Sequence, residues 1–137
     1  MQRFGRTQIS IRVLLADDHE TVRAGLRVVL AQEPRFQICG EAENGRDAVA
    51  KVKQLQPDAV VLDVSMPVMN GLEAAREIRR VAPSTKIVMF SMHDSSQMKD
   101  TARDAGADAF VLKTAPSQEL VRTIIDLLLV TNRNGSH

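Results

Sequence analysis

The chain contains no tryptophan and no tyrosine, and it has only four phenylalanines among 137 residues. So few rings argue against a flavin-carrying electron-transfer protein, whose cofactor is held by aromatic side chains; a colourless purified protein would exclude that class. The single cysteine, Cys39, cannot form an internal disulfide. The G-x-x-x-x-G-K-[ST] motif is also missing, which excludes a P-loop nucleotide enzyme.

Charge of one sign is not in excess, because 18 basic and 17 acidic side chains give a formal net charge of +1. No block of lysine and arginine stands out, so composition gives no sign of direct nucleic-acid binding. The apolar stretches are far shorter than a membrane span, and the first ten residues hold no hydrophobic signal region. We therefore expect a cytoplasmic protein without a membrane partner, and its length suits one domain with a single core.

Four apolar runs each end at polar residues that can handle a phosphate. The runs are 11–16, 59–62, 86–90 and 109–112, and the residues that follow them are Asp17 with Asp18, Asp63, Ser91 and Lys113. If the runs are parallel strands, their carboxyl ends share one edge of a sheet, where open α/β sheets bind ligands. Three carboxylates, a hydroxyl and an ammonium would meet there. Such a set can hold a divalent cation and receive a phosphoryl group.

Amphipathic stretches of helix length separate the runs. Apolar residues recur at helical spacing over 19–32, 48–55, 72–79 and 117–128. A further helix, capped by Asp94 or Ser95 and ending near Ala105, is poorly apolar, so we expect it to be the least firmly packed element. Residues 36–43 alternate as a strand does, and Asn44-Gly45 indicates a turn after it.

Strands that alternate with helices indicate βαβ units and a parallel sheet wound right-handed. Four of the strands are nearly all apolar, as central parallel strands are, whereas strand 36–43 has polar positions and belongs at an edge. The prediction is an α/β fold of flavodoxin-like type, a doubly wound (βα)5 unit whose five-stranded parallel sheet has the order 2-1-3-4-5. The domain is expected over 11–130, after an N-terminal extension (1–10) and before a polar tail or linker start (131–137).

Five segments occur in a fixed order along 11–130. They are LLADDHETVRAGL, GEAENGRDAV, PDAVVLDVSMPVMNGLEAAREIR, IVMFSMHD and GADAFVLKTAPSQEL. Together they resemble the receiver domain of two-component response regulators, and the DDH, SMHD and LKTAP pieces are most similar to the NarL/FixJ-type subfamily. The resemblance implies a phosphorylation switch rather than an enzyme, one that supports its own phosphotransfer and autodephosphorylation. A sensor histidine kinase would be its phosphoryl donor and partner.

The resemblance also implies a role for each acidic residue of the strand ends. Asp63 would be the phosphoacceptor, attacking the phosphohistidine of the kinase to form an acyl phosphate. Mg²⁺ would be held by Asp17, Asp18, Asp63 and the backbone carbonyl of Ser65, since a hard cation suits a few carboxylates plus water and phosphate oxygens. His19 lies next to these residues, and a lone histidine more often tunes hydrogen bonding than ligates metal.

The remaining roles concern the phosphoryl group itself. Lys113 would pair with its oxygens, Ser91 would bond to it and draw its loop inward, and Phe110 would turn inward behind Ser91 as the switch. Many receivers have proline after the lysine, whereas this chain has Thr114, which leaves a cis or a trans bond open. Met92 stands where many receivers carry a smaller residue, and we expect it to limit water access to the phosphate.

Rival classes use the same residues. A haloacid-dehalogenase-like phosphatase needs a second aspartate two positions after the nucleophile, where this chain has Ser65; turnover of a generic phosphoester would identify that class. The closer alternative is a stand-alone or phosphorylation-independent receiver that acts as a protein-interaction module. Taken singly, each strand-end residue could be explained as a helix cap, a turn residue or a core residue. To explain all of them in this way, such roles would have to coincide at four strand ends.

The output of the domain is open from the sequence. NarL/FixJ-type regulators usually continue into a helix-turn-helix domain, so DNA contact and control of transcription are expected only through an effector domain outside this chain. An excised receiver and a single-domain regulator both remain. The apolar residues of the last helix cover more than one helical face and predict an exposed patch for a homodimer on phosphorylation: Leu120, Val121, Ile124, Ile125, Leu127, Leu128, Leu129 and Val130.

Overall fold

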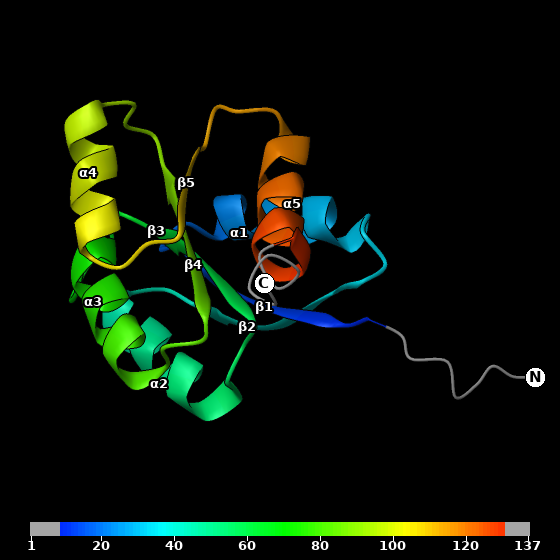
Figure 1. Ribbon diagram of the computed structural model, residues 1–137, viewed down its shortest axis with the longest axis horizontal. Helices are drawn as coiled ribbons and strands as arrows, with labels where there is room; N and C mark the ends of the chain where they lie inside the picture. The colour runs from blue at the N-terminus through cyan, green and yellow to red at the C-terminus, as the bar shows by residue number, and fades with distance from the viewer. Residues whose placement is uncertain (1–8, 131–137) are drawn as a thin grey trace, which may run out of the picture.

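A five-stranded parallel sheet runs through the centre of the protein (Figure 1), whose computed structural model describes residues 9–130. The strands are β1 (Ile11–Ala16), β2 (Phe36–Ala42), β3 (Ala59–Asp63), β4 (Lys86–Ser91) and β5 (Ala109–Leu112). Their order is β2-β1-β3-β4-β5 and all pairs are parallel. This confirms the predicted flavodoxin-like fold and the edge position of the polar strand β2.

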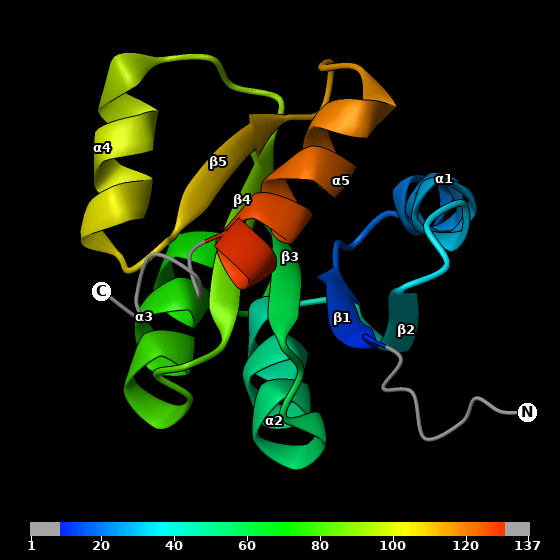
Figure 2. The same cartoon turned by 45° about the vertical axis from the view of Figure 1, so that its right-hand side comes forward.

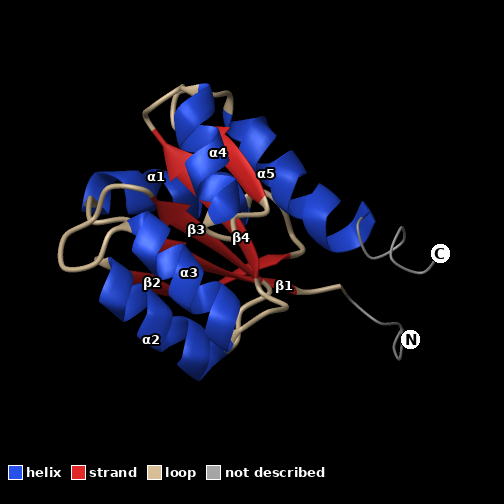
Figure 3. Ribbon diagram, turned by 60° about the vertical axis from the view of Figure 1, so that its left-hand side comes forward, coloured by secondary structure: helices blue, strands red, loops and turns tan. Residues whose placement is uncertain are grey.

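Helices cover both faces of the sheet (Figures 1 and 3). They are α1 (Glu20–Ala31), α2 (Gly45–Leu55), α3 (Gly71–Val81), α4 (Ser96–Asp104) and α5 (Ser117–Ile125), followed by a π-helical turn, η1 (Asp126–Val130). One apolar cluster joins the sheet to α2, α3 and α4, and a second joins the opposite face to α1 and α5. Figure 2 shows α1 beside β1 and β2, while α5 lies beside the strands at the other end of the sheet.

The two clusters follow from the alternation of side chains along each strand. In β1, Ile11, Val13 and Leu15 face the α1–α5 cluster, whereas Leu14 and Ala16 face the other. Both faces of the central strands are therefore buried, which explains why these strands read as continuous apolar runs.

Side chains cap the starts of two helices. The chain bends at residues 43–44 between β2 and α2, where the sequence predicted a turn, and the Asn44 side chain also accepts a hydrogen bond from the Asp47 N–H at 2.8 Å and caps α2. Ser95 caps α4 as predicted, through the Met98 N–H at 3.0 Å. Turns and N-caps use the same residue types, so the pattern predicted the turn at Asn44 without its capping role.

The last two helices bear on the predicted switch surfaces. In α4 only Ala102 is buried, whereas α3 buries four residues, in line with the expectation that α4 is the least firmly packed helix. The expected continuous helix over 117–128 instead changes to π-helical hydrogen bonding at Asp126, and Leu127 and Leu128 still pack against the α1–α5 cluster.

The predicted exposed apolar patch on the last helix is not found among the described side chains. Leu120 and Ile124 are buried, and the others up to Leu129 are half-buried; of these, Val121, Leu127 and Leu128 pack against the α1–α5 cluster. Apart from Ile9 and Ser10, the predicted extension (1–10) and the whole tail (131–137) lie outside the described residues. Every helix within 9–130 is too short or too polar to cross a bilayer.

Candidate functional site

The carboxyl ends of four strands bring the predicted residues into one buried group. Asp17 follows β1, Asp63 ends β3, Ser91 ends β4 and Lys113 follows β5. Asp17, Asp63 and Ser91 are at most 4% exposed. Burial to this degree is rare for a carboxylate, and here it applies to both aspartates. The neighbouring positions of β1 and β3 in the sheet place the two aspartates side by side, as the strand pattern predicted.

Lys113 joins the two carboxylates. Its Nζ lies 2.8 Å from Asp17 Oδ2 and 3.2 Å from Asp63 Oδ1. Its backbone N–H donates to the Ser91 carbonyl at 2.7 Å, so the β4–β5 pairing continues to the lysine. The Lys113 ammonium also lies 5.8 Å from the centre of the Phe90 ring. The Lys113–Thr114 bond is trans, and residues 9–130 contain no cis peptide bond.

The electrostatics of this group favour a cation. Burial, and then the charge of Asp17, raise the pKa of Asp63, and the lysine opposes this only in part. Burial acts against the Lys113 ammonium, but the hydrogen bond that it donates to Asp17 and the charge of Asp63 outweigh this effect and raise the pKa of Lys113. The charged form of Lys113 is therefore favoured, whereas the charged form of Asp63 is disfavoured. A further positive charge beside Asp63 would relieve that.

The ligand set for such a cation is present. Asp17, Asp18, His19 and Asp63 each offer one ligand atom, and these atoms all lie within 4.8 Å of one another. Asp18 Oδ1 is buried and accepts no hydrogen bond, so it is available to a metal. Carboxylate oxygens at this spacing fit Mg²⁺, which takes one or two carboxylates plus water and phosphate oxygens.

His19 occupies the outer side of the acidic pair. Its backbone N–H donates to Asp17 Oδ1 at 2.9 Å, and its Nδ1 lies 3.3 Å from that oxygen and 3.2 Å from Asp18 Oδ1. The imidazole is mostly exposed. The side chains of Asp17, Asp18 and His19 thus meet at one point, and Asp18 Oδ1 has no hydrogen-bond partner there.

The loop after Asp63 is shaped by backbone contacts. The Ser65 N–H points back to Asp63 Oδ1 at 3.3 Å, and the Gly71 N–H donates to the Val64 carbonyl at 2.8 Å. A Cβ on Gly71 would lie 2.0 Å from the Asp63 carbonyl oxygen. Gly71 is therefore required by the close approach of the loop to the end of β3, which carries Asp63.

Val68 at the tip of this loop has an unfavourable backbone conformation. Its φ is 69°, a left-handed value that costs a β-branched residue about 1–2 kcal/mol. Its side chain is 71% exposed, so little packing offsets the cost. We expect Val68→Asn to raise the free energy of unfolding by roughly 1 kcal/mol, because asparagine tolerates this region.

Urea melts compare Val68→Asn with Val28→Asn, a matched control. Val28 is also exposed, but it lies within α1, where valine and asparagine have similar helix propensity, so the control should be nearly neutral. A Val68→Asn protein no more stable than the wild type would mean that the loop conformation carries no strain.

Ser91, the last residue of β4, and Met92, the first residue after it, differ in burial. Ser91 is buried and its Oγ accepts a hydrogen bond from the His93 N–H at 3.0 Å. Met92 is 61% exposed and lines a groove of about 380 Å³ between α1 and the site, together with Phe90 and Lys113. Lys113 is the residue that borders both this groove and the acidic group.

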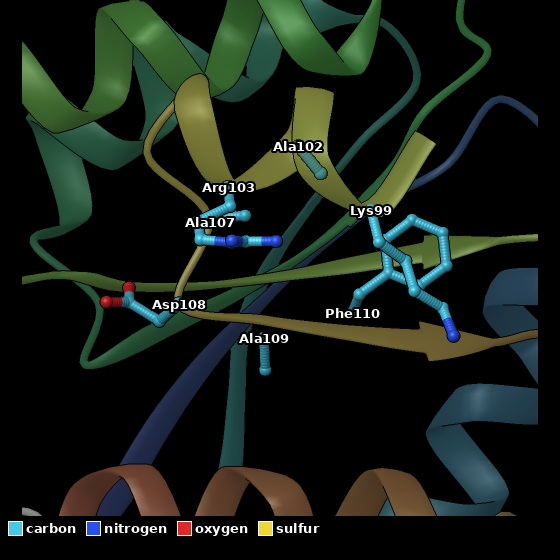
Figure 4. A pocket seen from close by; sticks show the side chains of 7 residues that line it. All are labelled: Lys99, Ala102, Arg103, Ala107, Asp108, Ala109 and Phe110. Atoms are coloured by element: carbon cyan, nitrogen blue, oxygen red, sulfur yellow. The ribbon is translucent and has the colours of Figure 1, made fainter. Parts of the chain in front are cut away.

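Phe110 lies on the opposite side of the sheet from this groove. It is half-buried against the α2–α4 cluster and lines a pocket of about 170 Å³ between α4 and β5. Figure 4 shows its ring extending from β5 toward α4, with Ala102 and Arg103 of that helix on the same pocket. The ring thus borders free space beside the helix that is least buried in the core.

Sequence reasoning missed a charged cluster behind the acidic pair. It consists of Glu20, Arg23, Arg27 and Glu41, from α1 and β2. Arg23 follows Val22 in the apolar stripe of α1 and is itself buried. An arginine inside an apolar helical stripe, combined with a glutamate in a strand, was the available signal.

Comparisons with known proteins agree with the geometry. A family model described as "Response regulator receiver domain" matches residues 13–125. The "Transcriptional regulatory protein DegU" of Brevibacillus brevis is 32% identical over 114 residues, which are 83% of this chain and 48% of that protein. The chain spans about half the length of the curated relatives it matches.

Two solved structures extend the likeness. A LuxR-family two-component response regulator from Aurantimonas sp. SI85-9A1 superposes with a TM-score of 0.84 at 34% identity, covering 87% of this chain and 85% of that one. The receiver domain of the putative response regulator NarL from Mycobacterium tuberculosis gives 0.82 at 31% identity, covering 86% and 95%.

Proposed function

Since the chain belongs to the receiver domains of two-component response regulators, in the NarL/LuxR class, we propose that Asp63 is its phosphoacceptor. A carboxylate oxygen of Asp63 attacks the phosphorus of a phosphohistidine on a sensor kinase, the P–N bond breaks, and the imidazole leaves with a proton. The product is an acyl phosphate. The observation that carries the proposal is the Lys113 ammonium within 3.2 Å of two buried carboxylates, Asp17 and Asp63.

Receiver domains bind Mg²⁺ at an acidic pocket, and this chain has such a cluster. Here we assign the ion to Asp17, Asp18, Asp63 and the Ser65 carbonyl. When bound, it supplies positive charge to the transferred group, which is most of what phosphoryl transfer requires from a protein. The protein's own part is to orient Asp63 and to keep Lys113 charged beside the phosphoryl oxygens.

Ser91 and Phe110 are assigned to the response that follows. The Ser91 hydroxyl would leave the His93 N–H and bond to the phosphoryl group, which draws the β4–α4 loop toward Asp63. The Phe110 ring would then move from the α4 pocket toward the space behind Ser91. The weak burial of α4 supports this assignment, because a loosely packed helix shifts at low cost.

The proposal is tested by incubating the domain with acetyl phosphate and Mg²⁺ and measuring the intact mass. We expect a gain of one phosphoryl group that EDTA prevents. A chain that takes up no phosphoryl group would instead be a phosphorylation-independent interaction module.

A cytoplasmic location and control of transcription through a DNA-binding domain outside this chain are proposed alongside, the second supported by the name of the DegU relative.

Met92 is proposed to hinder water at the acyl phosphate. Its position at the groove beside Lys113 supports this, and a flexible apolar side chain shields without supplying a base. Met92→Ala should therefore lose its phosphoryl group faster than the wild type at constant Mg²⁺. Val28→Ala, exposed on α1, is the control and should decay at the wild-type rate. An unchanged or slower decay in Met92→Ala would show that this side chain does not shield the phosphate.

Phosphorylation is also proposed to promote homodimerisation through the half-buried apolar residues of α5 and η1. These residues include Val121, Ile125 and Leu129, whose side chains are half-buried and so keep part of their apolar surface accessible. Sedimentation with beryllofluoride and Mg²⁺ should show a dimer that is absent without them. A monomer in both states at high concentration argues against self-association of this domain.

A further inference from the structure

The guanidinium of Arg23 lies directly behind the acidic pair, and each of its arms is bound. Nη1 donates to the Asp17 backbone carbonyl at 2.6 Å, Nε to Glu41 Oε1 at 2.8 Å and Nη2 to Glu20 Oε1 at 2.8 Å. The side chain is 9% exposed. A charge buried to this degree must be paired and hydrogen-bonded, and here one of its bonds is to a peptide of the proposed metal site.

With that bond, both backbone polar groups of Asp17 are hydrogen-bonded. The Asp17 N–H donates to the Ala42 carbonyl of β2 at 3.0 Å, and the Asp17 carbonyl accepts from Arg23. The chain leaves the sheet at this point, and the peptide whose carbonyl is held carries the N–H of Asp18. The direction of both carboxylates therefore depends on a peptide plane that Arg23 holds in place.

We propose that Arg23 is a positioning residue for Mg²⁺: by clamping the Asp17 carbonyl against β2, it aligns the Asp17 and Asp18 carboxylates on the ion. The inference rests on the proposed function, since it concerns the ion used for phosphoryl transfer at Asp63. Glu41 anchors the clamp from β2, and Glu20 anchors it from α1.

The charges of the cluster separate positioning from simple electrostatics. Arg27 pairs with both Glu41 and Glu20, at 2.6 Å in each case, so the two arginines and two glutamates sum to zero charge. If Arg23 acted only as a nearby positive charge, its removal would tighten Mg²⁺ binding. If it positions the carboxylates, its removal weakens binding. The two explanations predict opposite signs.

The test measures the Mg²⁺ dissociation constant of the wild type and its variants by NMR titration of backbone amides. Arg23→Met should raise it about tenfold or more, the usual effect of removing a group that orients a metal ligand. The double variant Arg23→Met with Glu41→Gln removes one positive and one negative charge, keeps the cluster neutral, and should show the same loss. Arg23→Lys keeps the charge but offers one donor group instead of a fork, and should be intermediate.

Arg79→Met is the matched control at the other end of the sheet. Arg79 donates to the carbonyls of Gly106 and Pro83 at 2.8 and 2.7 Å and pairs with Asp108 at 2.6 Å. Its removal should lower the melting temperature without changing the Mg²⁺ constant. If loss of packing in general weakened Mg²⁺ binding, Arg23→Met and Arg79→Met would both raise the dissociation constant.

The outcomes are distinct. Wild-type or tighter Mg²⁺ binding in the folded double variant overturns the positioning role. Asp18→Asn measured in parallel tests the site itself: if it binds Mg²⁺ as the wild type does, the proposed metal site fails, whatever Arg23 does. Weaker binding in Asp18→Asn and in both Arg23→Met proteins, with no change in Arg79→Met, supports the proposal.

Discussion

Asp63→Asn should reduce phosphoryl uptake from acetyl phosphate to background, the largest functional effect expected of any single substitution in the chain. The amide lacks the nucleophilic oxygen that forms the acyl phosphate. Intact-mass measurement detects the phosphoryl group directly, which is necessary because the chain has no tryptophan to report the event by fluorescence.

The matched control is Asp94→Asn, an exposed carboxylate in the β4–α4 loop that should leave uptake unchanged. Equal labelling of Asp63→Asn and wild type would refute the assignment of the phosphoacceptor. Loss of uptake is not to be explained by unfolding. Burial and the Asp17 charge raise the pKa of Asp63, so its ionisation is less favourable in the folded state than in the unfolded state.

The raised pKa of Asp63 predicts that Asp63→Asn is a stable variant. A carboxyl group with a raised folded pKa binds more protons in the native state, so stability falls as the pH rises from the unfolded pKa to the folded pKa. Above that window the ionised Asp63 destabilises the metal-free protein. Asparagine removes this charge, so Asp63→Asn should be at least as stable as the wild type at neutral pH.

The fold was predictable because its signals are local and repeated. Each central strand is a short, nearly continuous apolar run, whereas β2 has polar residues within it, Gln37 and Glu41, which indicated its place at the edge. Parallel strands end at one edge, so naming the residues after each run was enough to predict the group around Asp63 and Lys113. No contact between distant residues had to be guessed.

The parts that escaped prediction depend on tertiary contacts or on competing local geometries. Arg23 and Glu41 lie 18 residues apart and on different elements, and nothing local requires them to meet. Asn44 was predicted only as part of a turn, because asparagine is typical of turns and of N-caps alike, so its capping of α2 was not foreseen. The π-helical turn after Ile125 keeps apolar side chains against the core, which helical periodicity alone does not show.

Gly71→Ala is expected to have the largest effect on stability. The new Cβ would lie 2.0 Å from the Asp63 carbonyl oxygen and 2.8 Å from Val64 Cα, and both are backbone atoms that cannot swing aside. The loop or the end of β3 must shift, which should cost about 3 kcal/mol or more of the free energy of unfolding. Because the displaced atom belongs to the nucleophile, phosphoryl uptake by the folded fraction should also fall.

Gly25→Ala is the same substitution with the opposite expected sign. A Cβ on Gly25 meets nothing within 4 Å, and the residue lies inside α1, where alanine is favoured over glycine by roughly 0.5–1 kcal/mol. Urea melts of the two variants compare close approach with helix propensity in one protein. If Gly71→Ala were as stable as the wild type, the tight contact between the loop and β3 would not exist in solution. Gly71 would then not fix the position of Asp63.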